Sequence, residues 1–137
     1  MSQESKTPDL VELVRRLDEA VNVRDLDAIM SFYAPDAVWE GFLATREGVA
    51  AIRGFFEDWL ASYEELRLEH EEVLDLGNGV VFAVLIQKAR LVGSSGYVRY
   101  RNVLVAIWVE GLIERVTLYT DIDEARAAAE RLAEERR

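Results

Sequence analysis

The sequence contains no cysteine and a single histidine, His70. Without thiols, the chain can form no disulfide, no thiolate nucleophile and no zinc–thiolate site, and one histidine cannot build a histidine-rich metal centre. We therefore expect neither a metal site nor a cofactor. The absence of cysteine also gives no support for an oxidising compartment.

Basic residues and long apolar runs are also scarce. The chain has 16 Lys and Arg against 26 Asp and Glu, which gives a net charge of -10 and argues against a nucleic-acid or anionic-membrane partner. No window approaches the roughly 20 apolar residues of a membrane span, and MSQESKTPD resembles no secretion signal. We expect a cytoplasmic protein whose residues 1–7 form a flexible polar lead.

The 137 residues are 50% hydrophobic, which is enough for one core, and no repeat or linker interrupts them. We predict a single domain over residues 8–137. Thr7-Pro8-Asp9 favours the start of a helix, whose apolar stripe consists of Leu10, Leu13, Val14, Leu17 and Val21. Asp25 favours a second helix start, and Ala34-Pro35 favours its end.

A short strand, AVWEGF at residues 37–42, precedes a third predicted helix from about Gly48 to Tyr63. This helix has the heaviest aromatic stripe, which is typical of core packing: Phe56, Trp59 and Tyr63 lie on it with Val49, Ile52 and Leu60.

From Leu66 the apolar period changes to two, which predicts strands. Turn residues at 77–79, 93–96 and 110–111 divide this half into consecutive strands and so predict an antiparallel meander. Asp121 and Glu124 have capping-box spacing and open a short C-terminal helix.

The segment Val103–Val109 is apolar at every position, so both faces of this strand need cover. We predict a homodimer through the outer sheet face. The alternative is that the chain's own helices and tail cover both faces.

Three stretches carry a resemblance to a known family: RDLDAIMSFYAPDAVWEG (24–41), AAIRGFF (50–56) and GLIERVTLYTD (111–121). In this order they resemble the SnoaL-like branch of the NTF2-like superfamily, from about Leu10 to Glu124. The resemblance implies an α+β cone, in which a strongly curved, mainly antiparallel sheet wraps around the N-terminal helices and leaves a deep pocket. The family includes polyketide cyclases, ketosteroid isomerases, epoxide hydrolases and members without a known reaction, so the fold alone does not give the function.

This chain lacks the catalytic residues of two subfamilies at the matching positions. The isomerase base falls on Gly41 and the isomerase's acidic donor on Leu104, while the aspartates and arginine of the epoxide hydrolases fall on Leu85, Gln87 and Leu118. These matches depend on the strand register, because a slip of one residue moves every side chain to the other face. They argue against both mechanisms.

Two carboxylates remain as candidate catalytic bases. The cyclases use an aspartate near the end of the last strand, where Asp121 stands, although Asp121 can equally cap the terminal helix. Glu40 follows Trp39, and strand alternation turns it towards the rim unless a bulge returns it to the pocket as an acid of raised pKa. His70 alternates with Glu69 and Glu71, which favours a solvated histidine near acids.

We predict a pocket protein that binds a small, largely apolar, cyclic molecule of polyketide or steroid type, with cofactor-free isomerase or cyclase chemistry if it is an enzyme. The alternative is a non-catalytic dimerisation or ligand-sensing module whose cone is filled by its own side chains. The predicted ligand-binding residues are Trp39, Phe56, Trp59, Leu85, Gln87, Tyr100, Asn102, Leu104, Trp108 and Leu118.

Overall fold

The computed structural model describes residues 9–41 and 44–137. The flexible lead expected at residues 1–7 and the strand position expected at Phe42 lie outside this part of the chain. The described residues form four helices and six strands, in the order α1 (Leu10–Asn22), α2 (Leu26–Met30), β1 (Tyr33–Glu40), β2 (Thr45–Glu47), α3 (Val49–Ala61), β3 (Tyr63–Asp75), β4 (Val80–Leu91), β5 (Val98–Val109), β6 (Leu112–Tyr119) and α4 (Ile122–Glu135).

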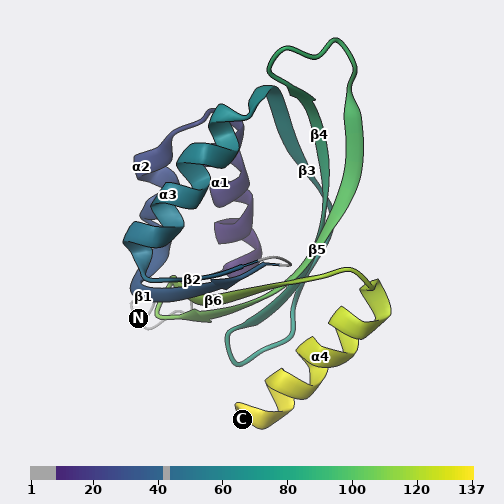
Figure 1. Cartoon of the computed structure of the whole chain (residues 1–137). Coiled ribbons are helices and arrows are strands. Elements are labelled where there is room, and N and C mark those ends of the chain that lie inside the picture. Colours follow the sequence, from purple (N-terminus) through teal and green to yellow (C-terminus); the bar gives the residue numbers. More distant parts are fainter. Residues whose placement is uncertain (1–8, 42–43) are drawn as a thin grey trace, which may run out of the picture.

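The strands form one curved sheet with the order β2-β1-β6-β5-β4-β3. Its neighbours are antiparallel except β1 and β6, which run parallel. Figure 1 shows α1, α2 and α3 on one side of the sheet and α4 on the other. The predicted α+β class, the meander and the short C-terminal helix are confirmed.

The first two helices begin where the sequence predicts, but the second ends before its predicted end. Asp9 caps α1 by accepting from the Glu12 amide, and Asp25 caps α2 by accepting from Ala28. The prediction that the second helix runs to Ala34-Pro35 is wrong, because α2 ends at Met30 and Pro35 lies within β1. Proline has no amide to donate, and the pairing of β1 with β6 is irregular between Tyr33 and Val38.

A bulge in β3 changes which face its side chains occupy. Leu68 lies opposite Gln87 and His70 opposite Leu85, and the register then shifts between His70 and Glu72. Beyond this shift Leu74 and Leu76 pack against the cluster under α4, whereas Leu66 and Leu68 belong to the other cluster. One extra residue thus lets a single strand contribute apolar side chains to both sides of the sheet.

Helix α4 covers the outward face of β4 and β5. Its three buried alanines, Ala125, Ala129 and Ala133, are buried in one cluster with Val80, Phe82, Val84, Val103 and Val105. The guanidinium of Arg126 lies 4.7 Å from the centre of the Phe82 ring. The chain itself therefore covers Val103 and Val105 on the outward face of β5, which agrees in part with the alternative to a dimer stated above.

The turn between β3 and β4 is as predicted. Gly77, Asn78 and Gly79 all have positive φ angles, and a Cβ at Gly79 would overlap the carbonyl oxygen of Trp108. The Asn78 side chain donates to Ala133 O and so joins this turn to α4. None of the helices in the described ranges is long and apolar enough to cross a membrane.

Candidate ligand cavity

A cavity of about 560 Å³ lies on the concave side of the sheet. Apolar side chains of α1, α3 and five strands form most of its wall. Aromatic rings pack edge to face along one side, with centroid distances of 5.5 Å for Trp39 and Phe56, 5.8 Å for Phe56 and Trp59, and 6.0 Å for Trp59 and Tyr63.

All ten residues predicted to bind a ligand line this cavity. Strand alternation explains why: Leu85 and Gln87 share one face of β4, and Asn102 lies opposite Leu85 on β5. Tyr100, Leu104 and Trp108 continue the same face. The structure thus brings these ten side chains together, and their role in binding a ligand stays a prediction.

Glu40 is not among the described residues that line the cavity. It lies on the other face of β1, where it accepts a hydrogen bond from the Thr117 hydroxyl at 2.7 Å and pairs with Arg115 at 2.7 Å. The hydrogen bonds from Arg115 and Thr117 hold the pKa of Glu40 below its usual range. This is the rim position that strand alternation favours, and it leaves Glu40 ionised and away from the cavity.

Asp121 acts as the N-cap of α4. Its carboxylate accepts from the amides of Asp123 at 2.8 Å and Glu124 at 3.1 Å, and it too is absent from the described cavity wall. Neither of the predicted bases therefore faces the cavity.

The carboxyl group that does face the cavity belongs to Asp18 on α1. Asp18 is 5% exposed, and one of its oxygens lies 2.7 Å from Nε2 of His70 on β3. Burial raises the pKa of Asp18, while the contact with His70 opposes that rise. Burial and the nearby Asp18 charge also raise the pKa of Tyr33, which lies on the same wall.

The sequence contains a signal for this pair, although the pair was not predicted. Asp18 stands four residues after Val14 and three before Val21, so it lies on the apolar face of α1. His70 has the same strand parity as Leu66 and Leu68, which also places it inward. The expectation of a solvated His70 is wrong in this respect, because the side chain is 26% exposed and contacts Asp18.

Tyr63 is a second missed residue. The helical stripe predicted it at the end of the third helix, but α3 ends at Ala61 and Tyr63 begins β3. From there its hydroxyl lies 3.0 Å from that of Tyr100. The amide of Gln87 donates to both hydroxyls, at 3.2 Å to Tyr63 and 2.6 Å to Tyr100, and Asn102 donates to Gln87 Oε1 at 2.8 Å.

Within the described chain, no three His, Asp or Glu side chains are arranged to hold a metal ion. Asp18 supplies a carboxyl group to the described cavity wall, and Tyr63, Gln87, Tyr100 and Asn102 supply hydrogen-bonding groups.

Comparisons with known proteins agree with this architecture. The family model described as SnoaL-like domain matches residues 14–116. No match was found among curated proteins.

Three similar solved structures illustrate the fold. An NTF2-like protein of unknown function from Burkholderia pseudomallei has a TM-score of 0.74 at 20% identity, over 86% of this chain and 95% of that one. A Mycobacterium tuberculosis protein in complex with estradiol-17beta-hemisuccinate has a TM-score of 0.72 at 19% identity, over 86% and 97%. A candidate polyketide cyclase from Sinorhizobium meliloti has a TM-score of 0.68 at 23% identity, over 86% and 100%.

Proposed function

Because this chain belongs to the SnoaL-like domain family, we propose that its cavity binds a small, largely apolar, cyclic molecule of steroid or polyketide type. The observation that carries the proposal is the cavity itself. Its volume of about 560 Å³ lies within the range of small-molecule sites, and its wall combines aromatic and aliphatic side chains with a few polar groups. The similar structure that holds an estradiol derivative supports the proposed ligand class.

The proposed chemistry is cofactor-free proton transfer of the isomerase or cyclase type. Asp18 is better placed for it than Glu40 or Asp121, because it faces the cavity and its pKa is raised rather than lowered. A carboxyl group with a raised pKa and a histidine 2.7 Å away can hold and return a proton. Asp18 is thus the proposed catalytic residue and His70 its positioning partner.

A thermal-shift screen with steroids, polyketide-like aromatics and terpenoids tests binding. A ligand at about 100 times its Kd should raise the melting temperature by several degrees. Leu104→Trp should reduce the shift because it fills the cavity, whereas Ile107→Trp places the same side chain on the opposite face of β5 and should leave it unchanged. A flat response of the wild-type protein across the whole set would overturn the proposal.

Catalysis is tested once a turned-over ligand is found. Asp18→Asn should lower kcat at least a hundredfold, while Glu40→Gln and Asp121→Asn should keep it near the wild-type value. Full activity in Asp18→Asn would exclude Asp18 as the proton carrier.

The alternative function is a ligand-sensing or dimerisation module without chemistry. The engagement of Glu40 with Arg115 and of Asp121 with α4 favours it, because both carboxylates already have structural partners. Binding without turnover across the ligand set would support this alternative. The homodimer and the cytoplasmic location also stay predictions.

A further inference from the structure

Four polar side chains form a cluster at one part of the cavity wall: Tyr63, Gln87, Tyr100 and Asn102. Gln87 is at its centre and is only 1% exposed. Three strands supply the cluster, since Tyr63 begins β3, Gln87 lies on β4, and Tyr100 and Asn102 lie on β5. Burying an amide costs free energy unless its hydrogen bonds are made, so the hydrogen bonds in this cluster have to be counted.

The bonds of Gln87 are fully assigned. Its carbonyl oxygen accepts from Asn102, which fixes the orientation of the amide, and its nitrogen donates one hydrogen to each tyrosine hydroxyl. Both tyrosine oxygens therefore act as acceptors towards Gln87.

The two hydroxyls also lie 3.0 Å from each other, so one of them donates to the other. This bond uses one of the two phenolic protons. Whichever tyrosine accepts it then accepts two hydrogen bonds, and its own proton has no acceptor among the described residues. The cluster thus keeps one O–H donor for a guest in the cavity.

The remaining donor is protonated at neutral pH. An oxygen that already accepts two hydrogen bonds is a better donor, because each bond polarises the next. Burial, followed by the contact with Tyr63, raises the pKa of Tyr100, so its hydroxyl keeps its proton.

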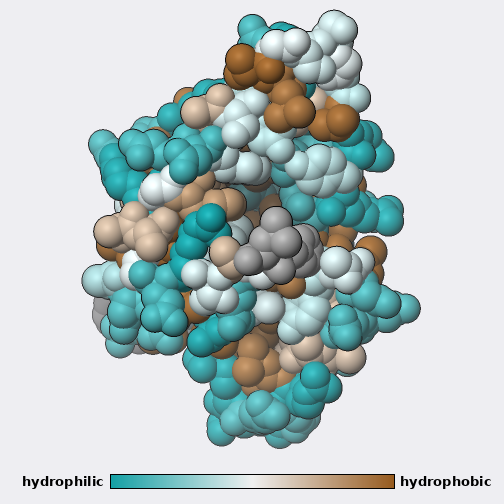
Figure 2. Space-filling view, in the orientation of Figure 1, coloured by the Kyte–Doolittle hydropathy of each residue, from teal (hydrophilic) through white to brown (hydrophobic). Residues whose placement is uncertain are grey.

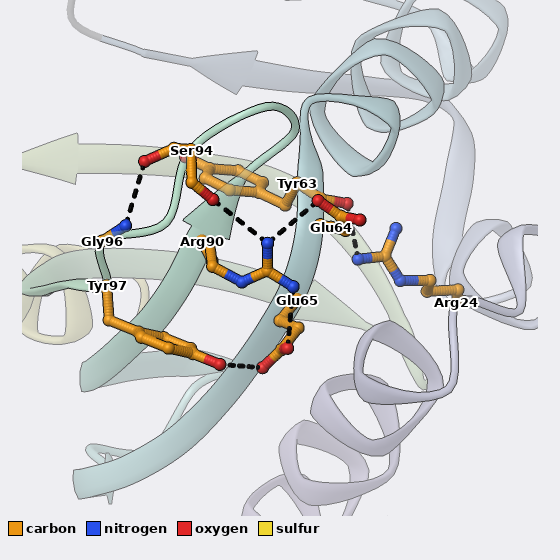
Figure 3. Close-up of polar contacts among 8 residues, drawn as sticks. All are labelled: Arg24, Tyr63, Glu64, Glu65, Arg90, Ser94, Gly96 and Tyr97. Atoms are coloured by element: carbon orange, nitrogen blue, oxygen red, sulfur yellow. Dashed lines mark hydrogen bonds and ion pairs between the residues drawn. The ribbon is translucent and has the colours of Figure 1, made fainter.

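The surrounding chain holds Tyr63 in place. Figure 3 shows Arg24, from the turn after α1, donating to the carbonyl oxygen of Tyr63 at 2.8 Å. The next two residues are fixed by Arg90, which donates to Glu64 at 3.0 Å and to Glu65 at 2.9 Å. A donor fixed in this way loses little conformational freedom when a guest binds.

We propose that the Tyr63–Tyr100 pair, oriented by Gln87, is a subsite for a ligand's acceptor oxygen, and that the preferred ligands are cyclic ketones or quinones rather than hydrocarbons of the same shape. This inference rests on the proposed function, because it requires the cavity to admit a ligand. It adds to that function the chemical group that the cavity selects.

Two probes with the same ring skeleton test the subsite, 1-tetralone with its carbonyl and tetralin without it. In calorimetric titration, wild-type protein should bind 1-tetralone about fivefold more tightly, the ratio that one net hydrogen bond gives. Replacing the whole cluster, Tyr63→Phe/Gln87→Leu/Tyr100→Phe/Asn102→Leu, should make the two probes bind equally, because loss of the hydroxyls alone would leave the Gln87 amide free to donate to the ketone. Each single variant, Tyr63→Phe or Tyr100→Phe, should keep most of the preference, because the remaining hydroxyl still accepts from Gln87 and has a free proton.

Tyr97→Phe is the matched control. Tyr97 is 65% exposed, and its hydroxyl donates to Glu65 on the same hairpin but outside the cavity wall. This variant should keep the wild-type ratio. Circular dichroism of the quadruple variant checks that it is folded.

The outcomes separate the two proposals. Equal wild-type affinity for the two probes would overturn the subsite and leave cavity binding standing, as would a preference that survives in the folded quadruple variant. Failure of wild-type protein to bind either probe would overturn the subsite, whereas the thermal-shift screen alone decides the proposed function. If the quadruple variant does not fold, the two single variants decide, because a loss of the preference in either one contradicts the hydrogen-bond count.

Discussion

Asp18 places a titratable carboxyl group on the apolar face of α1. Because burial raises its pKa above the ordinary value of 3.8, folded protein holds this proton more tightly than the unfolded chain does. The stabilisation is complete below about pH 4 and is lost as the pH rises through the folded-state pKa. Asp18→Asn has no proton to lose, so its unfolding free energy relative to wild type should increase from pH 4 to pH 7.

Urea denaturation at several pH values measures this difference. Asp58→Asn, at an exposed position of α3, is the control for the effect of an Asp-to-Asn substitution in itself. A constant difference for Asp18→Asn would show that Asp18 does not titrate differently in the folded and unfolded states.

For individual residues, the sequence predicted which side chains line the cavity better than it predicted which of them carry reactive or hydrogen-bonding groups. Strand parity and one aromatic helix stripe group the ten lining residues, and the resemblance to the family indicates which face of the sheet lines the cone. The same patterns did not identify Asp18 and Tyr63 as polar groups of the cavity. Asp18 is a charge within an apolar stripe, and Tyr63 continues a helical stripe one residue beyond the helix cap, Ser62.

At the level of the elements, Asp121 stabilises the beginning of α4. Asp121→Ala removes the acceptor for two backbone amides and should cost about 1 kcal/mol of unfolding free energy. Asp121→Asn should cost only a few tenths of a kcal/mol, because asparagine caps helices nearly as well. Thermal denaturation of both variants tests the cap, since a side chain without a capping role would leave the two variants equally stable.

The β3 bulge explains why the coverage of the sheet could not be derived from alternation alone. Alternation assigns Leu66, Leu68, Leu74 and Leu76 to one face, whereas the shift after His70 sends the last two to the α4 side. Nothing in the local sequence marks the extra residue, because its location is fixed by pairing with β4. The burial of the α4 alanines also could not be derived locally, since they gain an apolar partner only after the strands pair.

For the whole molecule, the cover that α4 provides changes where a second copy could bind. Five of the six exposed large apolar side chains in the described residues belong to the end of the β4–β5 hairpin: Leu91, Val92, Tyr97, Val98 and Tyr100. Figure 2 shows apolar side chains at this end of the molecule. Because contiguous apolar area drives association, we expect a homodimer to use this end rather than the outward face of β5.

Light scattering at micromolar concentration should therefore give about twice the chain mass of 15.6 kDa. Leu91→Ser/Val92→Ser should raise the dimer dissociation constant at least tenfold, because two apolar contacts are lost. Val23→Ser is the control, since Val23 is 64% exposed but belongs to the turn after α1. A monomer mass for wild-type protein would exclude the dimer, and a dimer that persists in the double variant would place the interface elsewhere.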